Sequence, residues 1–539
     1  MVRLFKQLHL WLERRPKLAG TALFFLSIFY FSILQWSKGF GDPDSFYHIK
    51  ISQLIVKQGI IFDFPYLQFT VLKNGFIDHH FLYHLLMMPF VTLLPALIGA
   101  KIFQVILAAV CILVFFYLLK KFAVKGAFWY TFFLFFCYPF IFRINLVKAP
   151  ALSVIFLLLA ILFIFRKKYW KLGILSFLYV WTYDGWFILA IMAIVYAVAD
   201  SWDFWLKSDG NSRSKLRPSF LAKVIKDRLF KDKANLKLIA SVALGLLLGI
   251  IINPYFPKNL GFYFVHIVQI GLVNFQTHIG VGAEWYPYSW SQFFRATGAS
   301  LLLLVPALSL FLYYRKKMNA EVKFFLLMAG LFLLATIKAK RNIEYLIPFF
   351  NLTAVWIYLT VERLPEFAGD FRTFRQSLNN FLGRDKRMRW LLGLAVIVGI
   401  INYQVYIVDT ARTSLSLLKF DKLEKVSQYF QGHSRPKAMV FHSDWSTFPL
   451  LFYHNSSNYY IVGLDPTFMY LYDKDKYQKW LDITRGERAD QLYDIIKNQF
   501  GSSYVLVEKN NEKMSNNLKN NFYFKNIYQD NEATLYQVN

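Results

Sequence analysis

The sequence predicts a polytopic α-helical membrane protein, with about 11 transmembrane helices, followed by a folded α/β domain. Hydrophobic residues make up 56% of the 539, and many apolar runs reach the roughly 17–25 residues that cross a bilayer. From residue 409 onward, short β-rich runs alternate with polar helical stretches instead. Because burial in such a chain takes place largely in lipid, a soluble multidomain enzyme is excluded.

The charge pattern indicates membrane topology and predicts no nucleic-acid partner. The formal net charge is +28, but Lys and Arg cluster in short segments between the apolar runs, as charges that set topology do. The two cysteines, Cys111 and Cys137, lie inside apolar runs, where cysteine acts as a small hydrophobic residue. Disulfides are therefore not expected to hold the fold together.

Twelve apolar runs are candidate crossings, and the charge rule removes one of them. If residues 81–98 crossed, the lysines at 120–125 would lie outside and every later basic segment would be inverted. This run carries His84, Pro89 and Pro95, so we expect an interfacial or re-entrant segment there. The eleven crossings that remain fall near residues 18–37, 99–119, 127–142, 150–165, 169–183, 185–199, 237–253, 297–314, 322–337, 342–361 and 390–408.

This count gives a consistent domain plan. The N-terminus is cytoplasmic together with the basic segments at 120–121, 166–168, 201–236, 315–317 and 362–389. A transmembrane domain spans residues 1–408, with long external loops at 38–98 and 254–296. An extracytoplasmic α/β domain spans residues 409–539, and its β-rich runs are 438–442, 459–462 and 504–507.

Two carboxylates directly follow the first predicted helix. Asp42 and Asp44 belong to the stretch Gly-Asp-Pro-Asp-Ser, at the membrane surface. A lipid-linked phosphate would be presented there, and a base or a metal ligand would be useful. The alternative is a turn that caps the next helix, because Asp and Ser are favoured N-cap residues.

Further acids and histidines stand in external turns. Asp78, His79 and His80 are adjacent and suit a metal or a phosphate, although interfacial histidines are commonly just solvated. Asp184 lies in a Trp-Thr-Tyr-Asp-Gly-Trp turn between two helices. An acid inside the membrane suggests a functional role, but the predicted topology places Asp184 near the outer interface, where a simple turn residue before Gly185 is the alternative.

Several cations lie on the external side, against the charge rule. Arg143 and Lys148 lie in one short external segment, and Lys338, Lys340 and Arg341 lie in another. Arginine binds phosphate through paired hydrogen bonds, so Arg341 is a candidate phosphate ligand. A few external Lys or Arg residues are nevertheless ordinary.

The external loop 254–296 is rich in glycine and aromatic residues and holds a single acid, Glu284. Aromatic rings pack on sugar faces, and one carboxylate can hold a metal or an acceptor. Tryptophans in such a loop also form the ordinary interfacial belt.

Taken in order, these pieces resemble the GT-C superfamily of membrane glycosyltransferases, and most closely the single-subunit catalytic oligosaccharyltransferases. The acidic motif after the first helix is matched by Asp42-Pro-Asp44-Ser-Phe-Tyr-His. The Glu-containing external loop is matched by Ala-Glu284-Trp-Tyr-Pro-Tyr, and the donor-phosphate arginine by Arg341 with its following aromatic and Pro residues. Ser-Asp444-Trp445 loosely matches the motif that opens the C-terminal domain.

The resemblance implies roles for these residues. Asp44 would take the proton from the acceptor or would polarise the acceptor, with Asp42 and Glu284 beside it. Arg341, helped by Lys148 or Arg143, would offset the charge that grows on the leaving phosphate. The C-terminal domain would frame the acceptor through Asp444, Trp445 and Asp465.

Two departures from the family pattern qualify the expectation. The second external segment normally carries a metal-binding acidic motif, and here it reads Leu-Val-Lys148-Ala-Pro. We therefore expect no required cofactor, with Mg or Mn possible if Asp42, Asp44, Asp78 and Glu284 assemble a site. The motif that reads an asparagine acceptor in the family is not intact after Asp444 and Trp445, which argues against protein N-glycosylation.

The sequence thus predicts transfer of a sugar or glycan from a polyprenyl-phosphate-linked donor to a lipid, glycan or protein acceptor at the extracytoplasmic face. The alternative is a lipid or polysaccharide transporter, or an envelope-assembly membrane protein. Coupled transporters keep ionisable residues inside their spanning helices, whereas the predicted spans here are nearly free of charge.

Overall fold

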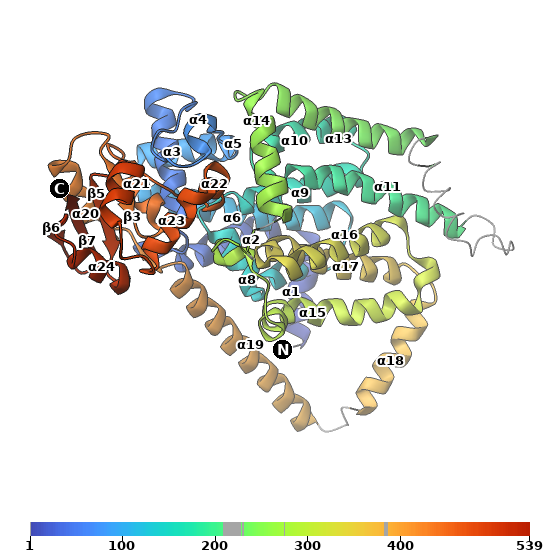
Figure 1. Cartoon of the computed structure of the whole chain (residues 1–539). Coiled ribbons are helices and arrows are strands. Elements are labelled where there is room, and N and C mark those ends of the chain that lie inside the picture. Colours follow the sequence, from blue (N-terminus) through green and yellow to red (C-terminus); the bar gives the residue numbers. More distant parts are fainter. Residues whose placement is uncertain (1, 208–227, 229–230, 274, 277, 382–385) are drawn as a thin grey trace.

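A computed structural model describes residues 2–207, 228, 231–273, 275–276, 278–381 and 386–539 (Figure 1). A helical membrane part carries a smaller α/β domain, drawn in orange and red, at one end. The predicted fold class is confirmed. The predicted basic segments at 201–236 and 362–389 fall partly outside the described residues.

Eight helical stretches among the described residues are long and apolar enough to cross a membrane, or nine with a bent pair. The bent pair joins Ala127–Phe136 (α7 with η1) to α8 (Tyr138–Asn145) at an angle of 83°. The eight are α2 (Pro16–Leu34), α6 (Ala96–Lys121), η2 with α11 (Asp184–Lys207), α13 (Lys233–Ile251), α15 (Trp290–Tyr313), α16 (Ala320–Lys338), η7 with α17 (Lys340–Glu362) and Trp390–Ser414 of α19 (Lys386–Ser414).

Three apolar helices are shorter than a span. α9 (Pro150–Phe165) has 16 residues, α10 (Tyr169–Val180) has 12, and α5 (Phe81–Leu93) has 13. At 1.5 Å per residue, α5 extends about 20 Å, less than the roughly 30 Å of a hydrocarbon core. α5 coincides with the segment expected to be interfacial or re-entrant, while the count of eleven and the orientation of the termini stay predictions.

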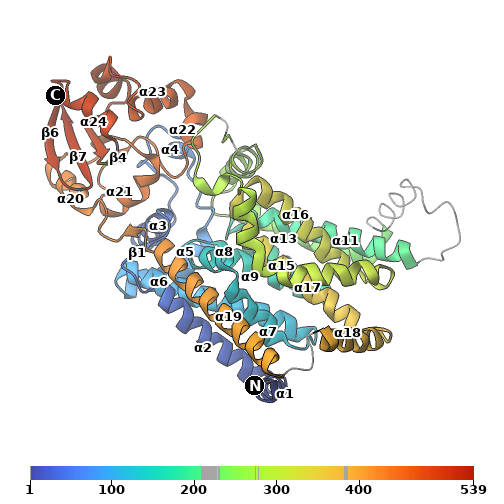
Figure 2. The same cartoon turned by 90° about the horizontal axis from the view of Figure 1, so that it is seen from below.

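α19 illustrates how the apolar surface faces lipid. It runs beside α2 (Figure 2), where the Gln404 side chain donates to the Tyr30 hydroxyl at 2.8 Å. Much of its remaining surface is exposed and apolar, as at Leu391, Val396 and Val405. In water such a surface would be an aggregation-prone patch, so lipid is the solvent that accommodates it.

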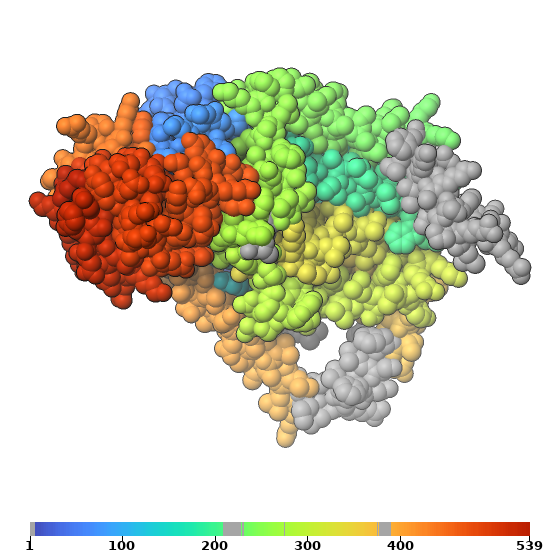
Figure 3. Space-filling view, viewed as in Figure 1, coloured from blue at the N-terminus to red at the C-terminus, as the bar shows by residue number. Residues whose placement is uncertain are grey.

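The two long loops that the sequence predicts to be external contain short helices. The first loop lies against the C-terminal domain, and the second lies between that domain and the long helices (Figure 3). The first loop contains α3 (Asp44–Gln58), α4 (Leu72–Gly75) and α5; the second contains α14 (Lys258–Tyr263), η4 (Phe264–Val273) and η5 (Ala283–Trp285). The remaining helices of the membrane part are α1 (Val2–Arg14), η6 (Arg315–Lys317) and α18 (Phe367–Phe381).

The C-terminal domain is built on a five-stranded mixed sheet of order β4-β3-β5-β7-β6. β3 pairs in parallel with β4 and β5, and the other pairs are antiparallel. The predicted β-rich runs become β3 (Met439–His442), β4 (Tyr459–Tyr460) and β5 (Tyr504–Glu508), followed by β6 (Phe524–Gln529) and β7 (Ala533–Val538). Its helices are α20 (Glu424–His433), η8 (Trp445–Thr447), α21 (Phe448–His454), α22 (Thr467–Tyr472), α23 (Lys474–Thr484), η9 (Asp494–Gln499) and α24 (Glu512–Lys519).

The first external loop is joined to this domain at two places. β1 (Gly39–Phe40) pairs antiparallel with β2 (Leu418–Lys419) just after α19. Farther along, the backbone of residues 66–69 extends the sheet beside β4, since Tyr460 donates to the Tyr66 carbonyl at 2.8 Å. The acidic motif after the first helix is therefore held against the C-terminal domain.

Gly41 permits the close approach that this arrangement requires. A Cβ there would lie 2.8 Å from the carbonyl oxygen of Ser414, a backbone atom that cannot easily move. The glycine immediately precedes Asp42, so it fixes where the acidic motif begins.

Candidate active site

Asp42, Asp44 and Lys148 form a carboxylate cluster at the start of α3. Lys148 Nζ lies 2.9 Å from Asp42 Oδ2 and 2.8 Å from Asp44 Oδ2. The side chain that accepts a backbone N–H at the start of the helix belongs to Asp42, whose Oδ1 lies 2.9 Å from Asp44 N. The capping alternative therefore applies to Asp42, and the Asp44 carboxylate is directed to Lys148.

The surroundings of Asp44 shift the pKa of its carboxyl group toward neutral pH. Burial raises the pKa of Asp44 to about 6, against the opposing attraction of Lys148. The side chain keeps 32% exposure, so it remains accessible to a ligand. Although burial opposes it, Asp42 and Asp44 raise the pKa of Lys148, and the amine stays charged.

Arg143 joins two glutamates in what we call the arginine–glutamate cluster. Its Nη1 lies 2.6 Å from Glu284 Oε2 and its Nε lies 2.7 Å from Glu344 Oε2. Arg341 Nη1 lies 3.4 Å from the other oxygen of Glu284. Although burial opposes it, Arg341, Lys148 and Arg143 hold the pKa of Glu284 well below its usual range. Arg143 is thus already committed to two carboxylates.

Arg341 is held in one orientation by its neighbours. Its guanidinium carbon lies 4.2 Å from the centre of the Trp285 ring, and it donates to the Tyr183 hydroxyl. A stacked guanidinium of this kind is favoured by cation–π attraction. The carboxylate and arginine–glutamate clusters together hold four acids (Asp42, Asp44, Glu284 and Glu344) and three cations (Lys148, Arg143 and Arg341).

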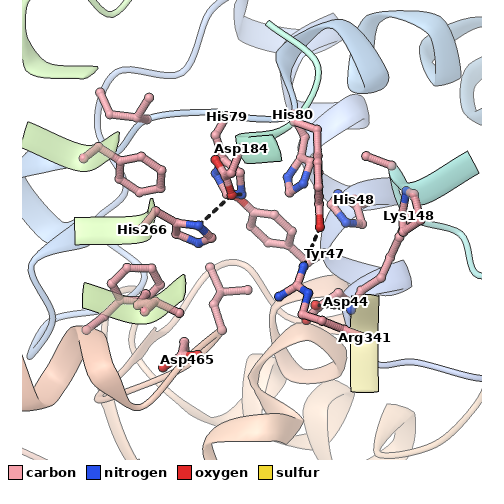
Figure 4. A pocket seen from close by; sticks show the side chains of 18 of the residues that line it. Asp44, Tyr47, His48, His79, His80, Lys148, Asp184, His266, Arg341 and Asp465 are labelled. Carbon is pink, nitrogen blue, oxygen red and sulfur yellow. Dashed lines mark hydrogen bonds and ion pairs between the residues drawn. The ribbon is translucent and has the colours of Figure 1, made fainter. Parts of the chain in front are cut away.

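Three cavities meet at the Arg143–Glu284 pair, which lines all of them. The histidine cavity holds about 120 Å³, the domain cavity about 670 Å³ and the lateral groove about 700 Å³. The lining of the histidine cavity also includes His48, His79, His80, Asp184 and His266 (Figure 4). The lining of the domain cavity also includes Asp42, Asp44, Lys148, Asp444, Trp445 and Asp465. The lining of the lateral groove also includes Tyr138, Tyr288, Arg295, Lys340, Arg341 and Tyr403.

Asp78 precedes His79 and His80, but unlike them it does not line the histidine cavity. Its Oδ2 lies 2.7 Å from His84 Nδ1, and His84 Nε2 lies 2.8 Å from His48 Nδ1. All three side chains are buried. Of the three, His48 lines the histidine cavity, whereas Asp78 and His84 lie behind it. Asp78 Oδ1 also accepts from His80 N at 3.1 Å, so Asp78 is linked to the cavity wall both through His84 and His48 and through the His80 backbone.

His79, Asp184 and His266 form a histidine cluster at one end of the histidine cavity. Asp184 Oδ2 lies 2.6 Å from His266 Nδ1 and 3.5 Å from His79 Nε2 (Figure 4). His80 lines the same cavity beside His48, with their ring centres 4.9 Å apart. The predicted residues His79, His80 and Asp184 thus line one cavity, whereas Asp78 lies behind it.

On the side of the C-terminal domain, Asp444, Trp445 and Asp465 line the domain cavity. Both acids also support turns, because Asp444 Oδ1 accepts from Ser446 N and Asp465 Oδ1 accepts from Thr467 N, each at 2.8 Å. Burial raises the pKa of Asp465. Asp42, Asp44 and Lys148 line the same cavity.

Four residues of the site were not predicted. Glu344 stands three residues after Arg341, and a buried acid at the start of a span is a recognisable signal. His48 lies one helical turn after Asp44, and Arg295 is a single cation near the start of a predicted span. Neither pattern alone predicts a site residue. His266 lies in an apolar stretch, and no sequence signal pairs it with Asp184.

No family model and no curated protein matches this chain, but solved structures do. The archaeal oligosaccharyltransferase AglB from Archaeoglobus fulgidus, solved with an inhibitory peptide and a dolichol-phosphate, aligns with a TM-score of 0.61 at 13% identity over 97% of this chain and 75% of its own. ArnT from Cupriavidus metallidurans, bound to undecaprenyl phosphate, aligns with a TM-score of 0.56 at 12% identity over 96% of this chain and 97% of its own.

The arabinofuranosyltransferase AftD from Mycobacteria aligns with a TM-score of 0.54 at 12% identity, over 96% of this chain and 40% of its own. These proteins are GT-C glycosyltransferases, and the alignments cover nearly the whole of this chain. At such low identity the likeness concerns the fold alone. The chain has the GT-C fold, in the form that resembles the oligosaccharyltransferases.

Proposed function

We propose that this protein is a membrane glycosyltransferase that moves a sugar or glycan from a polyprenyl-phosphate-linked donor to an acceptor at the extracytoplasmic face. One observation carries the proposal: Arg143 and Glu284 line both the lateral groove and the domain cavity. A ligand that enters from lipid and one that enters from water can therefore meet at this pair.

The lateral groove suits a lipid-linked donor. It lies between α8, α15 and α19, with Tyr138, Phe294 and Tyr403 among its walls, and α19 exposes much of its surface to lipid. AglB was solved with a dolichol-phosphate and ArnT with undecaprenyl phosphate. By analogy, the donor of this chain is carried on a polyprenyl phosphate.

The donor phosphate binds where positive charge is in excess. The charge of Arg143 is already balanced, because its guanidinium contacts the carboxylates of Glu284 and Glu344. The groove adds Arg295 and Lys340 next to Arg341. We therefore assign the phosphate to these three cations, which would stabilise the charge on the leaving group.

Asp44 is the proposed base. The acceptor oxygen or nitrogen attacks the anomeric carbon, the bond from that carbon to the phosphate oxygen breaks, and the electron pair leaves with the phosphate. The acceptor proton passes to Asp44, whose pKa of about 6 suits a general base near neutral pH. Lys148 holds the carboxylate in place.

Lys148 also replaces a metal ion at this point. Its amine lies between Asp42 and Asp44 at 2.8–2.9 Å from each, where a divalent cation would need the same oxygens. We therefore propose that transfer requires neither Mg nor Mn at the carboxylate cluster.

The acceptor is assigned to the domain cavity, as a lipid, glycan or protein. Trp445 offers an aromatic face to a sugar, and Asp444 and Asp465 line the same space. Because transfer is proposed at the extracytoplasmic face, the C-terminal domain is assigned to that side, and the N-terminus is assigned to the cytoplasm.

A direct test incubates the purified full chain with a panel of radiolabelled polyprenyl-phosphate sugars and with lipid, glycan and peptide acceptors. Formation of a labelled product in step with release of free polyprenyl phosphate is the expected result. Donors that all remain intact with every acceptor would contradict the proposal.

A lipid or polysaccharide transporter, or an assembly protein without catalysis, is the alternative. Transport coupled to ions uses charged groups near the middle of the spans. Here the acids and cations that line the histidine and domain cavities belong to the loops, to the ends of membrane helices and to the C-terminal domain, which favours transfer.

A further inference from the structure

Three potential metal ligands from separate segments converge at the histidine cluster. His79 precedes α5, Asp184 begins the turn η2 before α11, and His266 lies in η4 of the second external loop. Their ligand atoms all lie within 4.8 Å of one another. Figure 4 shows the three side chains gathered on the side of the cavity away from Lys148.

Hydrogen bonds satisfy this cluster only in part. The contact between His266 Nδ1 and Asp184 Oδ2 is a hydrogen bond, but His79 Nε2 lies 3.5 Å from the same oxygen, beyond good hydrogen-bond geometry. Asp184 Oδ1 and His79 Nδ1 are buried with no hydrogen-bond partner in the described part of the chain. Buried polar atoms left in this way are costly.

We propose that His79, Asp184 and His266 bind one transition-metal ion of the Zn²⁺ class, which clips the second external loop to the membrane part. Zinc bonds of about 2.0–2.1 Å in a tetrahedron separate ligand atoms by roughly 3.3 Å. The observed distances of 2.6 and 3.5 Å lie on either side of that value. The three ligand atoms lie within 4.8 Å of one another, so small side-chain movements would complete the site.

The ligand chemistry selects the metal. Two imidazoles and one carboxylate suit zinc and its first-row neighbours, whereas Mg²⁺ and Ca²⁺ prefer oxygen ligands alone. Three protein ligands leave a fourth position, which opens into the histidine cavity and would hold water.

The clip would act on the position of the loop. At one end of that loop, Glu284 pairs with Arg143 and Trp285 contacts Arg341. At its other end, the described ion pairs include that of His266 with Asp184. A metal at the histidine cluster fixes this second attachment. The inference concerns metal binding and loop stability, and it holds whether or not the protein transfers sugar.

The test uses the full chain, stripped with a chelator, exchanged into detergent and titrated with Zn²⁺, Co²⁺ or Mg²⁺. We expect one Zn²⁺ per chain by elemental analysis, an intense visible Co²⁺ spectrum typical of four-coordination, and a Tm raised by several degrees through binding to the folded state. Mg²⁺ should give no such shift.

Variants identify the ligands. His79→Gln, Asp184→Asn and His266→Gln should each lose the bound ion and the Tm shift, while His278→Gln should keep both, because His278 is exposed in the same loop outside the cluster. Asp184→Asn can still bond to His266, so its fold should survive. Failure of the wild type to bind zinc stoichiometrically, or equal binding by the three ligand variants, would overturn the proposal.

Discussion

The carboxylate cluster and the histidine cluster lie on different sides of one cavity system, and they treat their acids differently (Figure 4). Asp42 and Asp44 share the amine of Lys148, so a fixed side-chain cation already balances them. Asp184 instead faces two imidazoles, which can be neutral ligands. We therefore propose proton transfer for the aspartates of the first cluster and metal binding for the aspartate of the second.

This contrast explains why the departure from the family pattern matters. Lys148 stands in the second predicted external segment where the family pattern has a carboxylate, and it pairs with Asp42 and Asp44; we propose that this pairing makes the first acidic motif a base instead of a metal site. The metal-binding capacity then lies with residues that the resemblance did not assign as ligands, and the two clusters can be tested separately.

The substitution Asp44→Asn should have the largest effect of all, a loss of turnover. If Asp44 is the base, loss of its charge should slow transfer by about 10²–10⁴-fold, with little change in Tm, because Asp42 supplies the hydrogen bond to the backbone. Asp473→Asn is the matched control, since Asp473 caps α23 in the C-terminal domain. Full activity of Asp44→Asn would remove Asp44 from the mechanism.

Arg143→Met should have the largest effect on stability. It leaves the fully buried Glu344 without its ion-pair partner, and breaking a buried pair costs about 3–5 kcal/mol. Unfolding of the detergent-solubilised protein would measure this, with the exposed Arg315→Met as control. A near-normal unfolding midpoint would mean that Arg143 is free to serve as a phosphate ligand.

The pH dependence sharpens the role of Lys148. A base must be ionised, so activity should fall about tenfold per pH unit below about 6, the pKa of Asp44. Lys148 lowers that pKa, so Lys148→Gln should move the acidic limb to higher pH. A limb that stays in place in this variant would show that another group titrates.

The smallest expected effect is that of chelation on transfer at saturating donor. The Lys148 amine already lies between the carboxylates, so EDTA should change the maximal rate little, and Mg or Mn should add nothing. Complete loss of activity that Mg or Mn restores would contradict the proposal for the carboxylate cluster. A loss restored only by Zn²⁺ would trace to the histidine cluster.

The fold was largely predictable from the sequence, because spans and strands leave local patterns. Runs such as 99–119 and 504–507 carry their own hydrophobic signature and appear as α6 and β5. Local patterns failed where helices are short: α9 and α10 lack the length of a span, so eleven crossings remain a prediction.

The site was less predictable, since it depends on contacts across the chain. Asp42, Asp44 and Glu284 were found by their place after helices and in loops. The partner of Arg143 on α17 and the pairing of His266 with Asp184 arise only when segments distant in sequence pack together. Sequence spacing carries no information on such pairs.

The central claim is that the chain breaks the bond between sugar and lipid phosphate instead of moving the intact lipid. Proteoliposomes that contain the purified protein and a doubly labelled polyprenyl-phosphate sugar separate these outcomes, with Asp44→Asn as the inactive control. The account predicts that the sugar label leaves the lipid label and joins the acceptor, at a rate lowered by Asp44→Asn. Redistribution of the intact donor across the bilayer, with no separation of the labels, would contradict it.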